Sequence, residues 1–253
     1  MMLSILPGIQ IKNLQNNSRK VSQGDVFLAY PGAASDGRTY IQQAVDAGAV
    51  AIIYEPENYT PVACGIPCVA YPNLAASLGE LACKFYHEPT RELCVTGVTG
   101  TNGKTTIAYQ LAQAHELLNT KAAYIGTIGE GRVDALKPLL NTTPDALHIQ
   151  QLFHNYVKEN IKTVCMEVSS HALCMGRVDG VKFTQAIYTN LSHEHLDYHQ
   201  TLEAYAAAKA KLFASPELKF AIINQDDEHA AVMRAQIPNG CKALTYGLEH
   251  TCD

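Results

Sequence analysis

The chain has 253 residues and a formal net charge of −5, and 47% of its residues are hydrophobic while 17% are charged. This composition excludes a disordered chain, and an acidic balance without any lysine- or arginine-rich run argues against a nucleic-acid partner. No apolar stretch approaches the roughly 18 residues that cross a bilayer, and Met1 to Pro7 show no signal-peptide pattern. We therefore expect a cytoplasmic protein without membrane insertion.

The first 90 residues alternate predicted strands with predicted helices. Strands are expected at 26–30, 49–54 and 68–71, and helices at 40–47 and 74–86. Asn73 is expected to cap the second helix, because a side-chain oxygen at that position can accept a backbone N–H of the first turn. Pro89 breaks the pattern, so we predict two domains, over residues 1–90 and 91–253.

The second block alternates more regularly. Strands are expected at 93–98, 122–128, 163–168, 183–189, 219–223 and 243–246, and helices at 105–119, 145–160, 201–214 and 228–236. Gly129 and Gly131 are expected to open a loop. Strands that alternate with helices form a parallel sheet with helices on both faces. The expected fold class is therefore α/β, with a small N-terminal α/β domain followed by a larger, mostly parallel sheet domain.

The eight cysteines indicate buried, reduced thiols rather than disulfides. Cys64 and Cys68 have a spacing that occurs in zinc sites. No second Cys/His pair follows at the required distance along the chain, so we do not expect zinc.

A glycine-rich segment joins the strand at 93–98 to the next helix. It reads Thr99-Gly100-Thr101-Asn102-Gly103-Lys104-Thr105-Thr106. Such a loop can point backbone N–H groups at phosphate oxygens, and the helix N-terminus adds partial positive charge there. Lys104 can reach the β- and γ-phosphates, and the Thr105 hydroxyl suits Mg²⁺. Position 98 is Val where the usual motif has Gly, so a glycine-rich turn with a solvated lysine is the alternative.

The sequence of this loop resembles that of the Mur ligase family, ATP-dependent amide-forming enzymes of peptidoglycan precursor synthesis. Further segments support the resemblance, namely 167–173 with Arg177-Val178, 189–192 with 195–199, and 208–213. Asn141-Thr142-Thr143-Pro144 and residues 18–27 resemble the branch that adds the third amino acid. The match covers nearly the whole chain.

The resemblance implies a reaction and its substrates. Residues 1–90 would bind a UDP-linked precursor and residues 91–253 would bind ATP, with the family's C-terminal domain absent and this chain inactive alone. The implied ligase adds meso-diaminopimelate, favoured over L-lysine, to UDP-MurNAc-L-Ala-D-Glu through an acyl phosphate. ATP is the co-substrate, Mg²⁺ the cofactor, and a monomer with small-molecule partners only is expected.

The resemblance also assigns roles to residues. The ATP-binding set is Gly100, Thr101, Asn102, Gly103, Lys104, Thr105, Thr106 and Asn190. The substrate-binding set is Ser18, Thr142, Thr143, Ser169 and Arg177. The Mg²⁺ ligands are Thr105, Glu167, His195 and a carbamylated Lys209, and the catalytic residues are Lys104, Lys209, Glu167 and His195.

Elementary chemistry supports two of these assignments. Glu167 ends a predicted strand, and the carboxyl ends of parallel strands face the ligand crevice, where a hard oxygen ligand suits Mg²⁺. Its alternative is an N-terminal charge for a following helix. Lys209 must be neutral to react with CO₂, and burial would lower its pKa toward that state. Without the resemblance, Lys209 would be a lysine on a helix surface.

Other residues leave alternatives open. Thr142 and Thr143 could cap the helix near Asp145, and Asn190 could be a turn residue after a strand. The remaining histidines of this region, His171, His193 and His199, are expected to be structural.

The chain departs from the family pattern in two places. Asn17 stands where Asp is usual, and His193-Glu194 replaces the commoner Arg-Asp. Two other functions remain open. One is a folylpolyglutamate synthase-like ligase, which shares the phosphate loop and modified lysine but lacks a UDP domain. The other is a nucleotide-binding module that does not catalyse.

Overall fold

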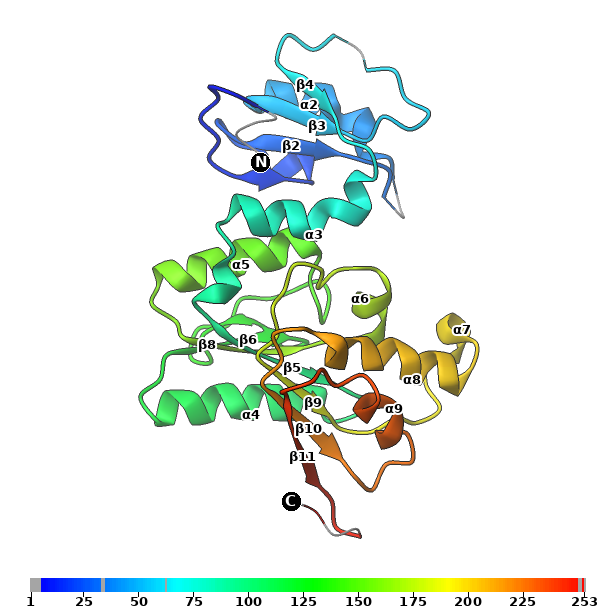
Figure 1. Ribbon diagram of the computed structural model, residues 1–253. Coiled ribbons are helices and arrows are strands. Elements are labelled where there is room, and N and C mark those ends of the chain that lie inside the picture. Colours follow the sequence, from blue (N-terminus) through cyan, green and yellow to red (C-terminus); the bar gives the residue numbers. More distant parts are fainter. Residues whose placement is uncertain (1–5, 33–34, 62, 250–251, 253) are drawn as a thin grey trace. The chain divides into compact units, whose positions relative to one another are not determined.

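The computed structural model describes residues 6–32, 35–61, 63–249 and 252 (Figure 1). The chain divides into two compact units, Met1–His87 and Glu88–Asp253. Most of the segment from Met1 to Pro7, which shows no signal-peptide pattern, lies outside the described residues. Within the described part of the chain, no helix is long and apolar enough to cross a membrane.

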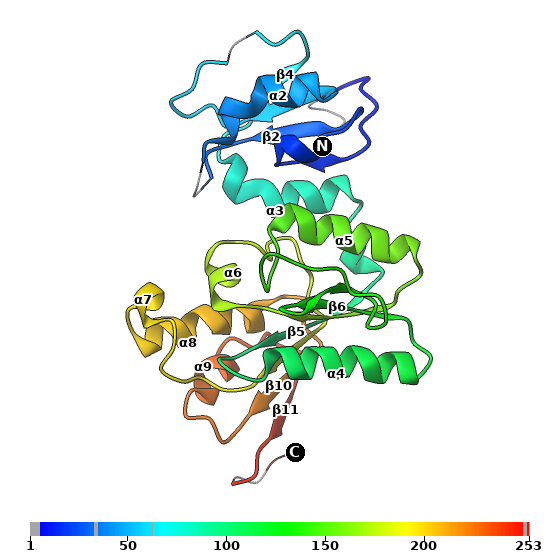
Figure 2. The ribbon, with the colours of Figure 1, turned by 180° about the vertical axis from the view of Figure 1, so that it is seen from behind.

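The first unit contains a four-stranded parallel sheet in the order β1-β2-β3-β4. Its elements are β1 (Leu14–Gln15), η1 (Ser18–Lys20), β2 (Val26–Ala29), η2 (Gly37–Tyr40), α2 (Ile41–Asp46), β3 (Ala51–Tyr54), β4 (Cys68–Ala70) and α3 (Leu74–Phe85). Every residue of β2 and β3 is buried, as their continuous apolar sequences predict for strands covered on both faces. Phe27 and Ile52 pack with Ile41 and Ala44 of α2, and α3 lies on the other face of this sheet (Figure 2).

The predicted cap of α3 is wrong. Asn73 precedes the helix with φ +57°, and its side chain makes no capping hydrogen bond. Instead, the backbone N–H of Leu74 donates to Oε2 of Glu55 at 2.8 Å. A carboxylate from the end of β3 therefore caps α3, while Asn73 supplies a left-handed backbone conformation that asparagine adopts more readily than most residues.

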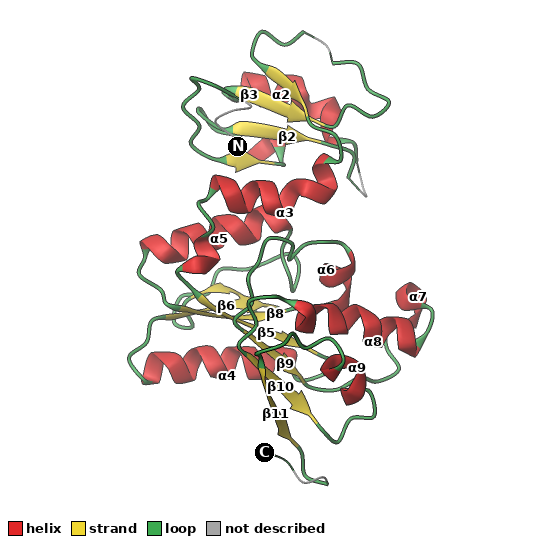
Figure 3. Ribbon diagram, in the orientation of Figure 1, coloured by secondary structure: helices red, strands yellow, loops and turns green. Residues whose placement is uncertain are grey.

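The second unit contains a seven-stranded sheet in the order β11-β10-β9-β5-β8-β6-β7 (Figure 3). Its strands are β5 (Cys94–Thr99), β6 (Ala122–Gly126), β7 (Gly129–Gly131), β8 (Thr163–Glu167), β9 (Gln185–Tyr188), β10 (Phe220–Asn224) and β11 (Lys242–Tyr246). All neighbouring strands are parallel except β6 and β7. The expected loop at Gly129 and Gly131 is thus a short antiparallel strand, and the expected α/β fold class is confirmed.

Helices cover both faces of this sheet, as predicted. They are α4 (Lys104–Leu117), α5 (Ala146–Lys158), α6 (Ser170–Cys174), α7 (Leu196–His199), α8 (Leu202–Ala210) and α9 (Ala230–Arg234), with the 3-10 turns η3 (Pro89–Arg91) and η4 (Lys211–Ala214). Figures 1 and 2 show α4 on one face and α5 and α8 on the other. Along β8 the residues alternate accordingly, with Val164 and Met166 in the core under α5 and α8, and Cys165 in the core under α4.

Parallel pairing brings the ends of the central strands to one edge of the sheet. Strands β5, β6, β8 and β9 run in the same direction, so the residues after their last positions gather there. In open α/β sheets this carboxyl edge is where ligands bind. The phosphate loop, Thr127, Glu167 and Asn190 all lie at or directly after these strand ends.

Candidate functional site

The Lys104 side chain folds back onto the phosphate loop and hydrogen-bonds to its backbone. Gly100 and Gly103 have φ of +148° and +85°, and a Cβ at Gly100 would overlap the Thr189 side chain, so only glycine fits there. Lys104 begins α4, and its Nζ donates to the carbonyl oxygens of Gly100 at 3.0 Å and Thr101 at 2.7 Å. The result is a glycine turn, a helix N-terminus and an ammonium group in one place, which suits an anionic phosphate.

The segment after β9 holds this loop from the side. The Thr189 hydroxyl donates to the carbonyl oxygen of Asn102 at 2.6 Å. The Asn190 amide accepts from the Asn102 N–H at 3.0 Å and donates to the Asn102 carbonyl oxygen at 3.2 Å. Asn190 therefore contacts the loop backbone through both ends of its amide, whereas Asn102, Gly103 and Thr106 are exposed.

A buried carboxylate lies beside the loop. Glu167, at the end of β8, is 1% exposed. Its oxygens accept hydrogen bonds from Tyr124 Oη at 2.5 Å, Thr127 N at 2.7 Å and Thr105 Oγ1 at 2.8 Å. These donors are neutral hydroxyl and amide groups, so they stabilise the negative charge of the Glu167 carboxylate without neutralising it. Such a carboxylate fits a nearby cation.

Lys209 is not a surface lysine. It is 1% exposed, and its Nζ donates to the Gly100 carbonyl oxygen at 2.7 Å and lies 4.2 Å from the centre of the Tyr205 ring. Burial, and secondly the ammonium of Lys104, lower the pKa of Lys209 to about 7. A substantial fraction of this amine is therefore neutral near pH 7, which is the nucleophilic form.

Histidine rings line the outer part of the same site. His195 is exposed and precedes α7 with φ +57°, and its ring centre lies 5.1 Å from that of His171. The pKa of His171 is lowered by burial and secondly by His195. His199 is buried, with Nε2 2.8 Å from the Ser170 hydroxyl, as a structural histidine would be. His171 instead faces the cleft, although the sequence suggested a structural role.

The expected substrate residues surround Glu167 on the other side. The Thr143 hydroxyl donates to the Glu167 carbonyl oxygen at 2.9 Å, and Arg177 donates to the Thr143 carbonyl oxygen at 3.2 Å. Ser169 caps α6 by accepting from the Ala172 N–H at 3.1 Å. The alternative that Thr142 or Thr143 caps α5 does not hold, because the cap is Asp145, which accepts from His148.

These side chains line one cleft of about 400 Å³. Of the expected residues it contains Gly100, Lys104, Thr105, Thr142, Thr143, Glu167, Ser169, Arg177, His195 and Lys209. It also contains residues outside the expected sets of site residues, namely Thr127, Asn141, Ser170, His171 and Tyr205. Thr127 was missed because the sequence placed it inside the strand expected at 122–128, whereas β6 ends at Gly126 and Thr127 follows it at the ligand edge.

The donor set of this cleft fits a magnesium ion in its chemistry. Among the described residues, no three histidine, cysteine or acidic side chains converge as a metal group. A cation here would depend on the Thr105 hydroxyl and a modified Lys209 in addition to Glu167 and His195. Three of these four would offer hard oxygen atoms, which is the preference of Mg²⁺.

The first unit has a polar pocket of its own, of about 370 Å³. It is lined by Asn16, Asn17, Ser18, Arg19, Phe27, Leu28, Tyr30, Gly32, Ser35, Gly37 and Tyr40. The Ser18 hydroxyl donates to Oε1 of Gln43 at 2.9 Å, and the Asn17 side chain caps η1. Ser18 therefore lies in a pocket whose amide and hydroxyl groups suit a polar ligand.

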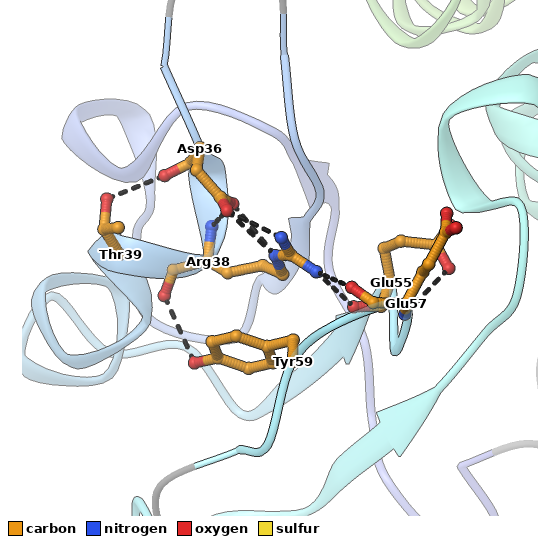
Figure 4. Close-up of polar contacts among 6 residues, drawn as sticks. All are labelled: Asp36, Arg38, Thr39, Glu55, Glu57 and Tyr59. Atoms are coloured by element: carbon orange, nitrogen blue, oxygen red, sulfur yellow. Dashed lines mark hydrogen bonds and ion pairs between the residues drawn. The ribbon is translucent and has the colours of Figure 1, made fainter.

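A buried arginine, Arg38, directly follows the pocket residue Gly37 along the chain, and Figure 4 shows its polar contacts. Arg38 forms an ion pair with Asp36 at 2.7 Å and donates to the carbonyl oxygens of Glu55 and Glu57 at 3.2 and 2.6 Å. Its guanidinium also lies 4.8 Å from the centre of the Tyr59 ring. The contacts fix the turn on both sides of Gly37, which lines the pocket.

Two family models match the chain. Residues 98–253 match the model of the Mur ligase middle domain. Residues 10–86 match the model described as Mur ligase family, catalytic domain.

Individual relatives are similar over nearly the whole chain. The UDP-N-acetylmuramoyl-L-alanyl-D-glutamate–2,6-diaminopimelate ligase of Pseudomonas putida is 46% identical over 248 residues, 94% of this chain and 50% of the relative. The ligase of the same name from Coxiella burnetii is 44% identical over 220 residues, 87% of this chain and 45% of the relative. A solved structure of a ligase with this name is 36% identical, with a TM-score of 0.79, and the match covers 95% of this chain and 49% of the other. The chain thus spans about half the length of these relatives.

Proposed function

Because this chain belongs to the Mur ligase family, we propose that the protein carrying these two units is an ATP-dependent ligase of peptidoglycan precursor synthesis. It joins an amino acid to UDP-MurNAc-L-Ala-D-Glu. The observation that carries the proposal is the single cleft in which a phosphate loop, a buried carboxylate and a buried lysine meet. The relatives' name supports diaminopimelate as the amino acid, and we propose its meso form.

The reaction has two steps. A D-Glu γ-carboxylate oxygen attacks the γ-phosphorus of ATP, so that ADP leaves and an acyl phosphate forms. The amine of the third amino acid then attacks the acyl carbon, and phosphate leaves as the amide bond forms. Phosphoryl transfer depends mainly on alignment and charge neutralisation, so the residues of the cleft act by holding groups in place.

Each residue has a defined part in that alignment. The phosphate-loop N–H groups and Lys104 bind the β- and γ-phosphates, and Arg177 with Thr142 orients the acidic substrate. Thr105, Glu167, His195 and carbamylated Lys209 would hold Mg²⁺, which neutralises charge on the phosphates. Asn190, one of the expected ATP-binding residues, would position the loop through its two hydrogen bonds with the Asn102 backbone.

The same geometry supports carbamylation of Lys209. The neutral amine attacks the carbon of CO₂ and loses one proton, which leaves an anionic carbamate. A pKa of about 7 supports this step, because the amine need not be stripped of its proton at high pH. The modification replaces a cation that repels Mg²⁺ with an oxygen donor.

The first unit would bind the UDP portion of the precursor at the pocket that contains Ser18. We place the reaction in the cytoplasm, since it consumes ATP and a UDP-linked compound. A folylpolyglutamate synthase-like activity is less well supported, because residues 10–86 match a Mur ligase model. A nucleotide-binding module without catalysis is an outcome of the test below.

The test is a phosphate-release assay with ATP, Mg²⁺, UDP-MurNAc-L-Ala-D-Glu and either meso-diaminopimelate or L-lysine. The 253-residue chain and a form extended to the length of the relatives are both assayed. We expect the extended form to release phosphate with meso-diaminopimelate and the 253-residue chain to turn over little. Nucleotide binding without phosphate release from either form would instead support the alternative, a nucleotide-binding module that does not catalyse.

Lys104→Ala should abolish phosphate release by the extended form, because it removes the only side-chain cation of the phosphate loop. The fold should persist, since Lys104 hydrogen-bonds only to loop carbonyl oxygens among the contacts described. Circular dichroism checks the fold and the assay checks turnover. A rate near that of the unchanged enzyme would refute the assignment of the loop.

A further inference from the structure

We propose that β6 and the residue after it form a cradle of Tyr124, Gly126 and Thr127, which orients the Glu167 carboxylate so that only Oε2 faces the cation. Tyr124, Gly126 and Thr127 are then positioning residues. The proposal rests on the proposed function, because it takes Glu167 as a ligand of Mg²⁺.

The hydrogen bonds divide the two oxygens of this carboxylate. Oε1 accepts from Tyr124 Oη at 2.5 Å and from the Thr127 N–H at 2.7 Å. An ionised carboxylate has about two lone-pair sites on each oxygen, so these two donors occupy Oε1. Oε2 accepts from two hydroxyl groups, Thr105 Oγ1 at 2.8 Å and Thr127 Oγ1 at 3.4 Å. The longer of these bonds can be given up, because the Thr127 hydroxyl also lies 3.1 Å from Thr142 Oγ1 and can turn its proton there. Oε2 can therefore be freed for a ligand, whereas Oε1 is held by two short bonds.

The backbone of β6 is shaped for this arrangement. A Cβ built on Gly126 would overlap both Oε1 of Glu167 and Oη of Tyr124. Glycine at this position lets the strand approach the carboxylate closely enough for the Thr127 N–H to donate. Any larger residue would push the carboxylate out of the cradle.

The tyrosine side of the cradle is buried. Tyr124 and Glu167 are 0% and 1% exposed, so solvent water does not replace the Tyr124 hydroxyl, whereas Thr127 is exposed where it lines the cleft. The Tyr124 hydroxyl is thus fixed against Oε1 in a buried position, and a fixed donor there holds the carboxylate rotamer.

The arrangement predicts ligation through a single oxygen. With Oε1 occupied, Glu167 can offer a cation only Oε2, next to the Thr105 hydroxyl oxygen. Groups that hold a metal ligand by hydrogen bonds typically contribute about 10- to 100-fold to metal affinity. Tyr124 touches neither nucleotide nor substrate in this scheme, so its loss should weaken the metal and leave metal-free nucleotide binding unchanged.

The test compares two buried tyrosine–glutamate pairs. Tyr124→Phe removes the hydroxyl that donates to Glu167. Tyr156→Phe is the matched control, since Tyr156 donates to Glu130 at 2.7 Å and both residues are buried away from the cleft. Binding of Mn²⁺ in the presence of ADP is measured by electron paramagnetic resonance, and ADP binding in EDTA is measured by calorimetry.

We expect Tyr124→Phe to bind Mn²⁺ about 10-fold more weakly with unchanged ADP affinity in EDTA, and Tyr156→Phe to bind Mn²⁺ normally. Gly126→Ala should lose at least as much as Tyr124→Phe. Unchanged Mn²⁺ affinity in folded Tyr124→Phe, or an equal loss in Tyr156→Phe, overturns the cradle. If the unchanged chain takes up no Mn²⁺ with ADP, both the cradle and the proposed function of the cleft are refuted. If only the cradle is wrong, the unchanged chain still binds Mn²⁺ with ADP, so the two failures can be told apart.

Discussion

Lys209 couples the site to the stability of the second unit. Its pKa is about 7 in the folded chain, whereas an unfolded lysine has a pKa of about 10.4. Between these values the unfolded chain binds more protons than the folded one, so the free energy of unfolding rises with pH. Below pH 7 the amine is protonated in both states, so the full cost of burying its charge applies and Lys209 adds no further pH dependence.

We therefore expect Lys209→Met to flatten the pH dependence of unfolding between about pH 7.5 and 9.5. The slope that Lys209 contributes approaches about 1.4 kcal/mol per pH unit. Urea denaturation in bicarbonate-free buffer measures it, and Lys158→Met, at an exposed helix position, is the control. Equal slopes in Lys209→Met and the unchanged chain would contradict the shifted pKa.

At the scale of elements, the long periodic segments were predictable, whereas some of the short ones were not. Helices α4 and α5 follow clear start and stop signals, and β5 and β8 are apolar runs of strand length. The strand β7 contains two glycines and exists because it pairs with β6, which is a tertiary effect. The short helices α6 and α7 were also missed, whereas the five-residue α9 lies within the helix expected at 228–236.

The residues of the site likewise divide into those that the sequence predicted and those that it did not. Gly100 and Lys104 belong to a contiguous motif, and the sequence alone indicates their chemistry. Tyr124 could not be found that way, because its hydroxyl meets Glu167 only after β6 and β8 pair in register. The burial of Lys209 likewise depends on packing of α8 against the sheet, which the sequence of that helix does not reveal.

The cap of α3 leads to a prediction for the first unit. Glu55→Ala removes the carboxylate that accepts from the Leu74 N–H, so a first-turn donor loses its partner and the helix loses an anion at its N-terminus. We expect the free energy of unfolding to fall by about 1 kcal/mol. Urea denaturation measures it, and Glu57→Ala is the control because that side chain is exposed. An equal effect of both substitutions would show that charge, and not the cap, is responsible.

At the scale of the whole chain, each unit has an apolar cluster of its own among the described residues. Phe27 packs within a cluster whose members all belong to the first unit. Phe153 packs within a cluster confined to the second unit, the one that carries the phosphate loop. Each unit thus has the apolar interior that an independent folding unit requires.

Because each unit has an apolar cluster of its own, we predict that a nucleotide changes the thermal stability of one unit and not of the other. A ligand that binds only the folded second unit stabilises it by about 2.7 kcal/mol at a concentration 100 times its Kd. In calorimetry we expect Mg²⁺ with ADP to raise the melting temperature of one transition. That transition should be the one that Phe153→Leu lowers, whereas Phe27→Leu should lower the other. A single transition that shifts as a whole in both variants and with ADP would mean that the units unfold as one.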